Sequence, residues 1–241
     1  VTDSSGSGEN GNTVTQSNTG GIVGGFENSS YASVSQCAYS GTITTSGTGA
    51  FINLGGIVGI AGTISNCTTS GAINMAGGRM ENVGGIAGRV YSSTTNCISN
   101  MSITLNSNAN KYGISNIQYV GGLVGNGVTI TNCTTNGTIT ASASNSFDSY
   151  YAQINYVGGL VGTAYTISSS SASGAINIKS GKSAQYVGGI AGYLRNGVNK
   201  SYSTMNISVT PEGQNIGGLA GYGYSLSLIH ISEPTRLQLI S

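Results

Sequence analysis

The stretch "GGIVGIAGTISNCTTSGAI", residues 55–73, decides the fold because variants of it recur along the chain. Its opening pattern, Gly-Gly-[Ile/Leu]-[Val/Ala]-Gly, occurs seven times at intervals of 29 to 37 residues. The copies begin at Gly20, Gly55, Gly84, Gly121, Gly158, Gly188 and Gly217. Repetition at such a period is typical of proteins that stack one small structural unit many times.

The second half of the stretch keeps a strict register in the first six copies. A position occupied by Cys or Ser has a β-branched residue three places before it and an isoleucine six places after it. The β-branched residues are Val34, Ile64, Thr94, Ile130, Ile167 and Val198. The isoleucines are Ile43, Ile73, Ile103, Ile139, Ile176 and Ile207. Only the spacers before the next glycine pair vary in length.

Each repeat offers three short segments rich in Ile, Val and Thr, separated by Gly, Asn and Ser, and shows no helical periodicity. Such a unit cannot bury its own apolar face, whereas stacked units share a continuous core. We therefore expect an all-β, right-handed parallel β-solenoid (β-helix) of about seven coils of roughly 30 residues. Spacers such as residues 140–156 would leave it at one corner as loops. An antiparallel β-sandwich is the alternative.

The glycine pairs fit tight corners and close approach between coils. We expect this structural role in every copy, as at Gly55, Gly56, Gly121, Gly122, Gly158 and Gly159. A dinucleotide fingerprint is disfavoured because the following helix and the downstream acid are missing. In "VGGLVG", residues 120–125, strict alternation would put Val120 and Val124 on one face and Leu123 on the other. Either the chain bends at the glycines or both faces are covered, since an exposed apolar stripe would mark a partner surface.

Four cysteines occupy the same repeat position in successive copies, and serine replaces them in the next two. They are Cys37, Cys67, Cys97 and Cys133, followed by Ser170 and Ser201. The position therefore demands a small side chain, and we expect free, buried thiols aligned in one column. A disulfide between stacked neighbours is the alternative, although the spacing between strands slightly exceeds the Cβ separation that a disulfide prefers. No Cys-x-x-Cys pair is present, so the spacing typical of zinc sites is absent and we expect no metal.

A polar residue precedes most of these positions, which fits a turn whose side-chain amide bonds to the backbone. The residues are Asn66, Asn96, Asn132, Ser169 and Lys200.

Residues 55–73 resemble the GLUG-type repeats of bacterial secreted and cell-surface proteins, and the resemblance covers about residues 20–222. It implies β-solenoid building blocks of large, adhesin-like proteins, located outside the cell by secretion or on the cell surface. It implies neither catalysis nor a particular ligand. Met101 and Met205 stand where other copies carry Gly, so the sequence leaves open whether that position faces inward or outward.

The end of the chain departs from the repeat. The segment "LSLIHISEPTR", residues 226–236, resembles the in-frame translation of a transposase-type sequencing adapter, and a natural cap of the stack is the alternative. The only histidine, His230, lies in this segment and is assigned no role.

We divide the chain into a polar segment at residues 1–19, a repeat domain at 20–225 and a non-native tail at 226–241. The first segment is expected to end a preceding repeat. Because the sequence begins at Val1 without a signal peptide, we expect a fragment of a longer protein.

Composition and charge exclude several functions. Charged residues make up 6% of the chain and the net charge is +1, so neither nucleic acid nor anionic lipid is an expected partner. No apolar run is long enough for membrane insertion. Outside the tail the acidic residues form no column that could pair carboxylates for hydrolysis or bind calcium, and no histidine can act as a base. These acids are Asp3, Glu9, Glu27, Glu81, Asp148 and Glu212.

We therefore expect no enzyme activity and no cofactor. The expected function is a non-enzymatic extracellular or cell-surface module for adhesion, which binds a host protein or glycan and adjoins further repeats of the same parent chain. Tyr150 and Tyr151 in "FDSYYAQ" are the candidate binding residues, because tyrosines in loops can stack on sugar rings. A passive stalk that displays another domain is the first alternative. A polysaccharide-degrading β-helix enzyme and an ice-binding protein are distant ones.

Overall fold

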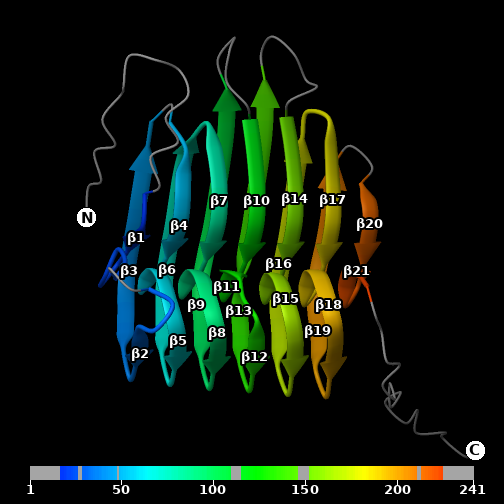
Figure 1. The fold of residues 1–241 in the computed structure, drawn as a ribbon. Coiled ribbons are helices and arrows are strands. Elements are labelled where there is room, and N and C mark those ends of the chain that lie inside the picture. Colours follow the sequence, from blue (N-terminus) through cyan, green and yellow to red (C-terminus); the bar gives the residue numbers. More distant parts are fainter. Residues whose placement is uncertain are drawn as a thin grey trace, which may run out of the picture.

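The computed structural model describes residues 17–26, 29–47, 49–109, 115–145, 152–210 and 213–224. In these residues all regular structure is β-strand, arranged in three sheets, A, B and C (Figure 1). Every pairing between strands is parallel. The expected all-β, parallel arrangement is therefore confirmed, and the antiparallel sandwich is wrong for the described residues.

Each of the first six repeats contributes to all three sheets in turn, and the described residues of the seventh contribute to sheets A and B; the repeats follow one another in a row from blue to orange in Figure 1. Sheet A contains β1 (Thr19–Gly20), β4 (Phe51–Gly55), β7 (Arg79–Gly84), β10 (Ser115–Gly121), β14 (Ala152–Gly158), β17 (Ser183–Gly188) and β20 (Gln214–Gly217). Sheet B contains β2 (Ser33–Ser35), β5 (Val58–Ser65), β8 (Ala87–Thr95), β11 (Val124–Asn126), β12 (Thr129–Thr131), β15 (Val161–Ser168), β18 (Ala191–Asn199) and β21 (Ala220–Gly223). Sheet C contains β3 (Ala38–Ser46), β6 (Thr68–Gly77), β9 (Ile98–Ala109), β13 (Thr134–Asn145), β16 (Ser171–Ser180) and β19 (Tyr202–Thr210).

The register between repeats is the one that the sequence predicts. Gly55 pairs with Gly84 in sheet A, whereas Ile64 pairs with Thr94 in sheet B. In sheet C the six isoleucines of the repeat pair with one another in sequence order, from Ile43 to Ile207. Equivalent residues of successive repeats therefore stack as columns.

The glycine pair forms the corner between sheets A and B. Val120, Leu123 and Val124 are all 0% exposed, because the chain bends at the glycines instead of continuing as one strand. A Cβ atom on Gly122 would lie 2.2 Å from the carbonyl oxygen of Gly159 in the next repeat. Glycine is required here by close approach of neighbouring backbones, and the apolar residues of this copy are covered on both faces.

The spacers are less loop-like than expected. The expectation of a loop over residues 140–156 is wrong for most of that range, because residues 140–145 continue β13 and residues 152–156 belong to β14. The extension of β13 is stabilised by Ala141 and Ala143, which remain buried. Met101, whose facing the sequence left open, points into the core and is 2% exposed.

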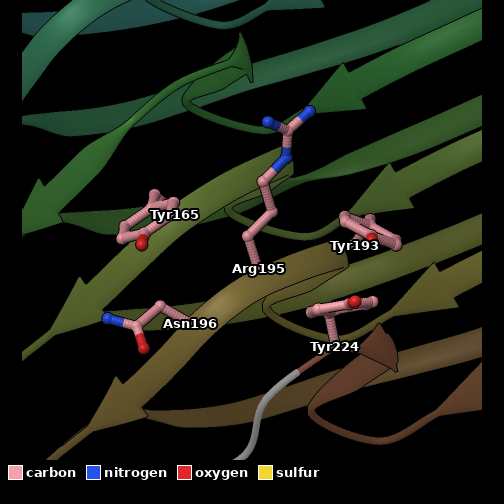
Figure 2. Close-up of a pocket in the computed structure, with 5 residues that line it drawn as sticks. All are labelled: Tyr165, Tyr193, Arg195, Asn196 and Tyr224. Atoms are coloured by element: carbon pink, nitrogen blue, oxygen red, sulfur yellow. The ribbon is translucent and has the colours of Figure 1, made fainter.

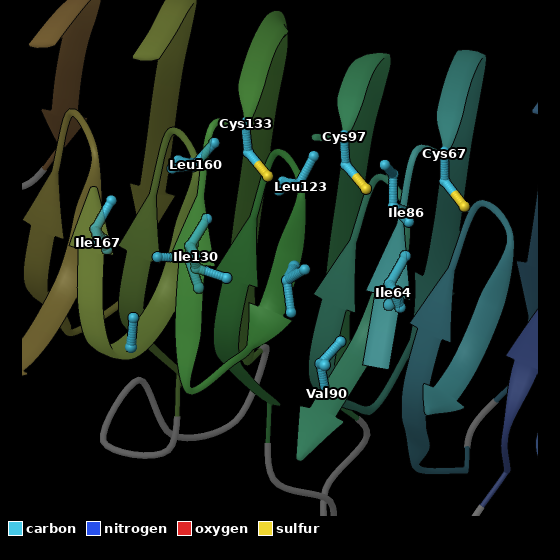
Figure 3. Close-up of a cluster of buried hydrophobic side chains, with 14 of the residues drawn as sticks. Ile64, Cys67, Ile86, Val90, Cys97, Leu123, Ile130, Cys133, Leu160 and Ile167 are labelled. Atoms are coloured by element: carbon cyan, nitrogen blue, oxygen red, sulfur yellow. The ribbon is translucent and has the colours of Figure 1, made fainter. Parts of the chain in front are cut away.

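Two apolar clusters fill the space between the sheets. One joins sheets A and C around the isoleucine column of sheet C, with Leu54, Val83 and Val120 opposite it. The other joins sheet B to the cysteine column and to the corner residues Ile86 and Leu123 (Figure 3). Because every repeat supplies the same positions, the core continues along the row of repeats.

Candidate functional site

The cysteine column lies at the turn between sheets B and C. The Cys67 Sγ lies 3.2 Å from the carbonyl oxygen of Ser65, and the Ser170 hydroxyl donates to the equivalent carbonyl of Ser168 at 2.7 Å. Cys37, Cys97 and Cys133 make the same contact, also at 3.2 Å. The position therefore requires a small side chain that can donate to the carbonyl two residues earlier, which explains why both Cys and Ser occur there.

These thiols are suited to a structural role. All four are free in the structure, and all but the half-buried Cys37 are buried. Burial raises the pKa of Cys67 to about 11, and the hydrogen bond with Cys133, together with burial, raises the pKa of Cys97. Among the described residues, no group of three or more His, Cys, Asp or Glu side chains could hold a metal ion.

The residue before each column position has a left-handed backbone conformation. Asn66, Asn96 and Asn132 have φ between 52° and 54°, which fits the predicted turn. Their amides, however, bond to one another: Asn96 Nδ2 donates to Asn66 Oδ1 at 3.3 Å, and Asn132 Nδ2 donates to Asn96 Oδ1 at 2.7 Å. For Asn96 and Asn132 the amide group therefore donates to the stacked asparagine of the preceding repeat and not, as expected, to the backbone.

A second left-handed column lies two residues before six of the seven glycine pairs, at the end of the sheet A strands. In two early repeats it holds Asn53 and Asn82, and the Asn82 Nδ2 donates to Asn53 Oδ1 at 2.9 Å. In three later repeats the same position holds Tyr119, Tyr156 and Tyr186, with φ of 56° to 59°. Asparagine tolerates this conformation, whereas a bulky side chain there costs about 1–3 kcal/mol.

The three tyrosines form a stack along the repeats. The ring centroids of Tyr119 and Tyr156 lie 5.0 Å apart with the planes inclined by 11°, and those of Tyr156 and Tyr186 have the same separation and inclination. Each ring is half-buried, so part of it remains in contact with solvent. Burial, and then the neighbouring tyrosine hydroxyls, raise the pKa of Tyr156.

Two tyrosines of sheet B pack edge-on against this stack. Tyr193 and Tyr222 stack on each other at 5.4 Å, and Tyr186 meets Tyr193 edge-on at 6.2 Å. We call the combined surface the tyrosine face. It consists of Tyr119, Tyr156, Tyr186, Tyr193 and Tyr222.

A depression of about 500 Å³ adjoins the tyrosine face and shares Tyr193 with it (Figure 2). We call it the tyrosine–arginine pocket. It is lined by Tyr165, Tyr193, Arg195, Asn196 and Tyr224. Tyr165 is 51% exposed and Tyr224 is 76% exposed, so both rings can contact a ligand from solvent.

Most of the binding and catalytic candidates that the sequence singled out cannot be compared with this site. Tyr150 and Tyr151 lie outside the described residues, as does Asp148. Glu81 is described, and its carboxylate accepts a hydrogen bond from Arg79 Nε at 2.8 Å. The tyrosine face carries a signal that a column-by-column reading of the repeats would reveal, namely Tyr-Val-Gly-Gly at residues 119–122, 156–159 and 186–189.

Comparison of the chain with protein-family models, with curated proteins and with solved structures found no match. Within the described residues there is no helix long and apolar enough to cross a membrane. What the chain does is therefore inferred from its own residues and their geometry.

Proposed function

We propose that the chain is a right-handed parallel β-solenoid of the GLUG type that acts as a non-enzymatic adhesion module, secreted or held on a cell surface. Parallel pairing, the shared register and one pass per repeat through sheets A, B and C support the solenoid. The right hand follows from the strong preference of parallel crossovers for that hand. The partner is a host protein or glycan, and further repeats of the parent chain adjoin this one.

The tyrosine face is the observation that carries the adhesion proposal. Asn53 and Asn82 satisfy the same backbone position and also bond to their stacked neighbours, so the fold does not need an aromatic ring there. Tyr119, Tyr156 and Tyr186 accept a strained conformation instead. Amphipathic rings that are partly exposed in a row are the side chains that bind sugars and proteins well.

The alternatives lack such an observation. A passive stalk needs the stack of repeats but not the tyrosines, so it predicts no binding at this face. Ice binding needs unbroken threonine ladders, yet in sheet C Thr44 pairs with Asn74 and Thr140 pairs with Asn177. For a β-helix hydrolase, Glu81 is the one described acid, and it pairs with Arg79.

The test replaces each ring with the residue that other repeats carry at the same position. We expect the variant Tyr119→Asn, Tyr156→Asn, Tyr186→Asn to lose retention on glycan and host-protein arrays that retain the unchanged chain. Its melting temperature should change little, because the strain relieved in the left-handed conformation offsets the ring stacking that is lost. Circular dichroism and thermal melting of the full chain measure the second outcome.

Two further variants separate the explanations. Tyr202→Ala removes an exposed tyrosine from sheet C and should leave retention unchanged. Tyr150→Ala with Tyr151→Ala tests the residues that the sequence singled out. If retention depends on this pair alone, the binding site lies at Tyr150 and Tyr151 and not at the tyrosine face. Absence of retention on any array would favour the stalk, and reproducible turnover of a polysaccharide would overturn both readings.

A further inference from the structure

We propose that the tyrosine–arginine pocket binds an acidic glycan, a chain of pyranose sugars that carry carboxylates. The inference rests on the adhesion module proposed above and names its ligand class. Two exposed rings, an amide and a guanidinium share one depression, which is the combination that recognises a flat, hydroxylated and negatively charged ring.

A distortion of sheet B places the polar residues of the pocket. Ala164 pairs with Leu194 and Thr166 pairs with Gly197, so Tyr165 of β15 faces two residues of β18 instead of one. These two residues are Arg195 and Asn196, and both are exposed. Such bulges re-aim side chains and are frequent beside functional sites.

The same distortion occurs in an earlier repeat with a different outcome. In β8 the register shifts so that Tyr91 and Ser92 face Gly62 of β5. There the guanidinium of Arg89 lies 4.8 Å from the centre of the Tyr91 ring, so the ring already has a cation over it. In the pocket, Tyr165 and Tyr224 keep exposed ring surface, and in Figure 2 the Arg195 side chain lies between Tyr165 and Tyr193.

Charge favours an anion as the occupant. Glu81 is the only acidic residue in the described part of the chain, and its carboxylate pairs with Arg79. No described carboxylate therefore lies within ion-pair distance of Arg195. A guanidinium binds a planar carboxylate through two parallel hydrogen bonds, and the Asn196 amide can bond to a sugar hydroxyl.

The rings supply the remaining contact. One face of a pyranose presents C–H groups, which pack on the exposed surfaces of Tyr165 and Tyr224. Tyr193 belongs to both the pocket and the tyrosine face, so a chain of sugars bound in the pocket can continue along the face. The pocket accordingly confers the preference for a charged sugar, and the tyrosine face lengthens the surface that contacts the sugar chain.

The experiment uses the full chain and polygalacturonate as the probe, with its fully methyl-esterified form as the neutral match. Affinity is measured by titration calorimetry at low ionic strength. We expect binding of the acid form only, weakened by salt. Arg195→Gln should lower that affinity about tenfold or more, the change expected when a charge-assisted hydrogen-bond pair is lost. Tyr224→Ala should lower it severalfold, whereas Tyr224→Phe should retain it.

Matched controls test the assignment. Arg89→Gln removes the same charge at the other bulge, and Tyr202→Ala removes an exposed ring from sheet C; neither should change the affinity. Poly-glutamate tests for a general attraction to polyanions.

The possible failures are distinguishable. Equal binding of both polygalacturonate forms, or equal binding of poly-glutamate, would overturn the acidic-glycan inference and leave the adhesion module standing. The same holds if polygalacturonate does not bind while the arrays still retain the chain through the tyrosine face. Absence of binding in the calorimetric titrations together with absence of retention on every array would overturn both proposals.

Discussion

At the scale of single residues, burial in the stack lowers the reactivity of the Cys67 and Cys97 thiols. Cys67 and Cys97 are fully buried, and burial raises the pKa of Cys67 to about 11. The thiolate is the reactive form of cysteine. A raised pKa therefore removes most of the reactive form at mildly alkaline pH, and it does so only while the chain is folded.

We expect a thiol reagent to modify Cys37, which is only half-buried, before the other three cysteines. The modification rate of native Cys67 should rise with pH toward about 11, as its thiolate forms. Cys67→Ser is the matched control, because Ser170 already occupies the equivalent position. After denaturation without a reducing agent all four thiols should react. If only two thiols or none react, the cysteines of the column form disulfides in solution.

At the scale of elements, the corner glycines differ in how closely the next repeat approaches them. We expect Gly122→Ala to destabilise the protein by about 1–3 kcal/mol, because its Cβ would overlap the Gly159 carbonyl oxygen. Gly218 has the same position in the seventh copy, and nothing lies within 4 Å of a Cβ built there. Gly218→Ala should therefore have little effect. Equal urea-unfolding midpoints for the two variants would contradict the close approach between repeats.

The strands and their register could be predicted from the sequence, because the Ile64 and Ile73 positions recur with fixed spacing and stacking follows from repetition. The partners of polar side chains could not. The position of Asn96 predicts a turn, but only the neighbouring repeat shows that Asn66 accepts its hydrogen bond. The strand extension at residues 140–145 was also hidden, because polar and small residues there resemble a loop.

The candidate site was missed for a related reason. The sequence directs attention to Tyr150 and Tyr151, which are adjacent along the chain. Tyr119, Tyr156 and Tyr186 are far apart in sequence and meet only because parallel strands stack at about 4.8 Å. Tyr165 and Arg195 meet through a bulge, which is a local change of register that residue spacing alone does not reveal.

At the scale of the whole molecule, we expect the tail at residues 226–241 to be separable from the repeats. It lies outside the described residues. We expect its deletion to leave the melting temperature and the circular dichroism spectrum unchanged, because a translated adapter was never selected to pack on this core. A clear loss of stability would identify the tail as a natural cap. Re-sequencing across residue 225 of the coding region is the independent check.

The corner at the glycine pair also has an evolutionary consequence. The first six repeats enter sheet A and leave sheet C at equivalent points, so recombination between two of them can duplicate or delete a whole unit without creating a new core. Drift at one position, from Asn53 to Tyr156 for example, then alters the surface of a single unit. A lineage that carries this gene can thus lengthen or shorten its contact surface by unequal crossing-over and diversify that surface one copy at a time.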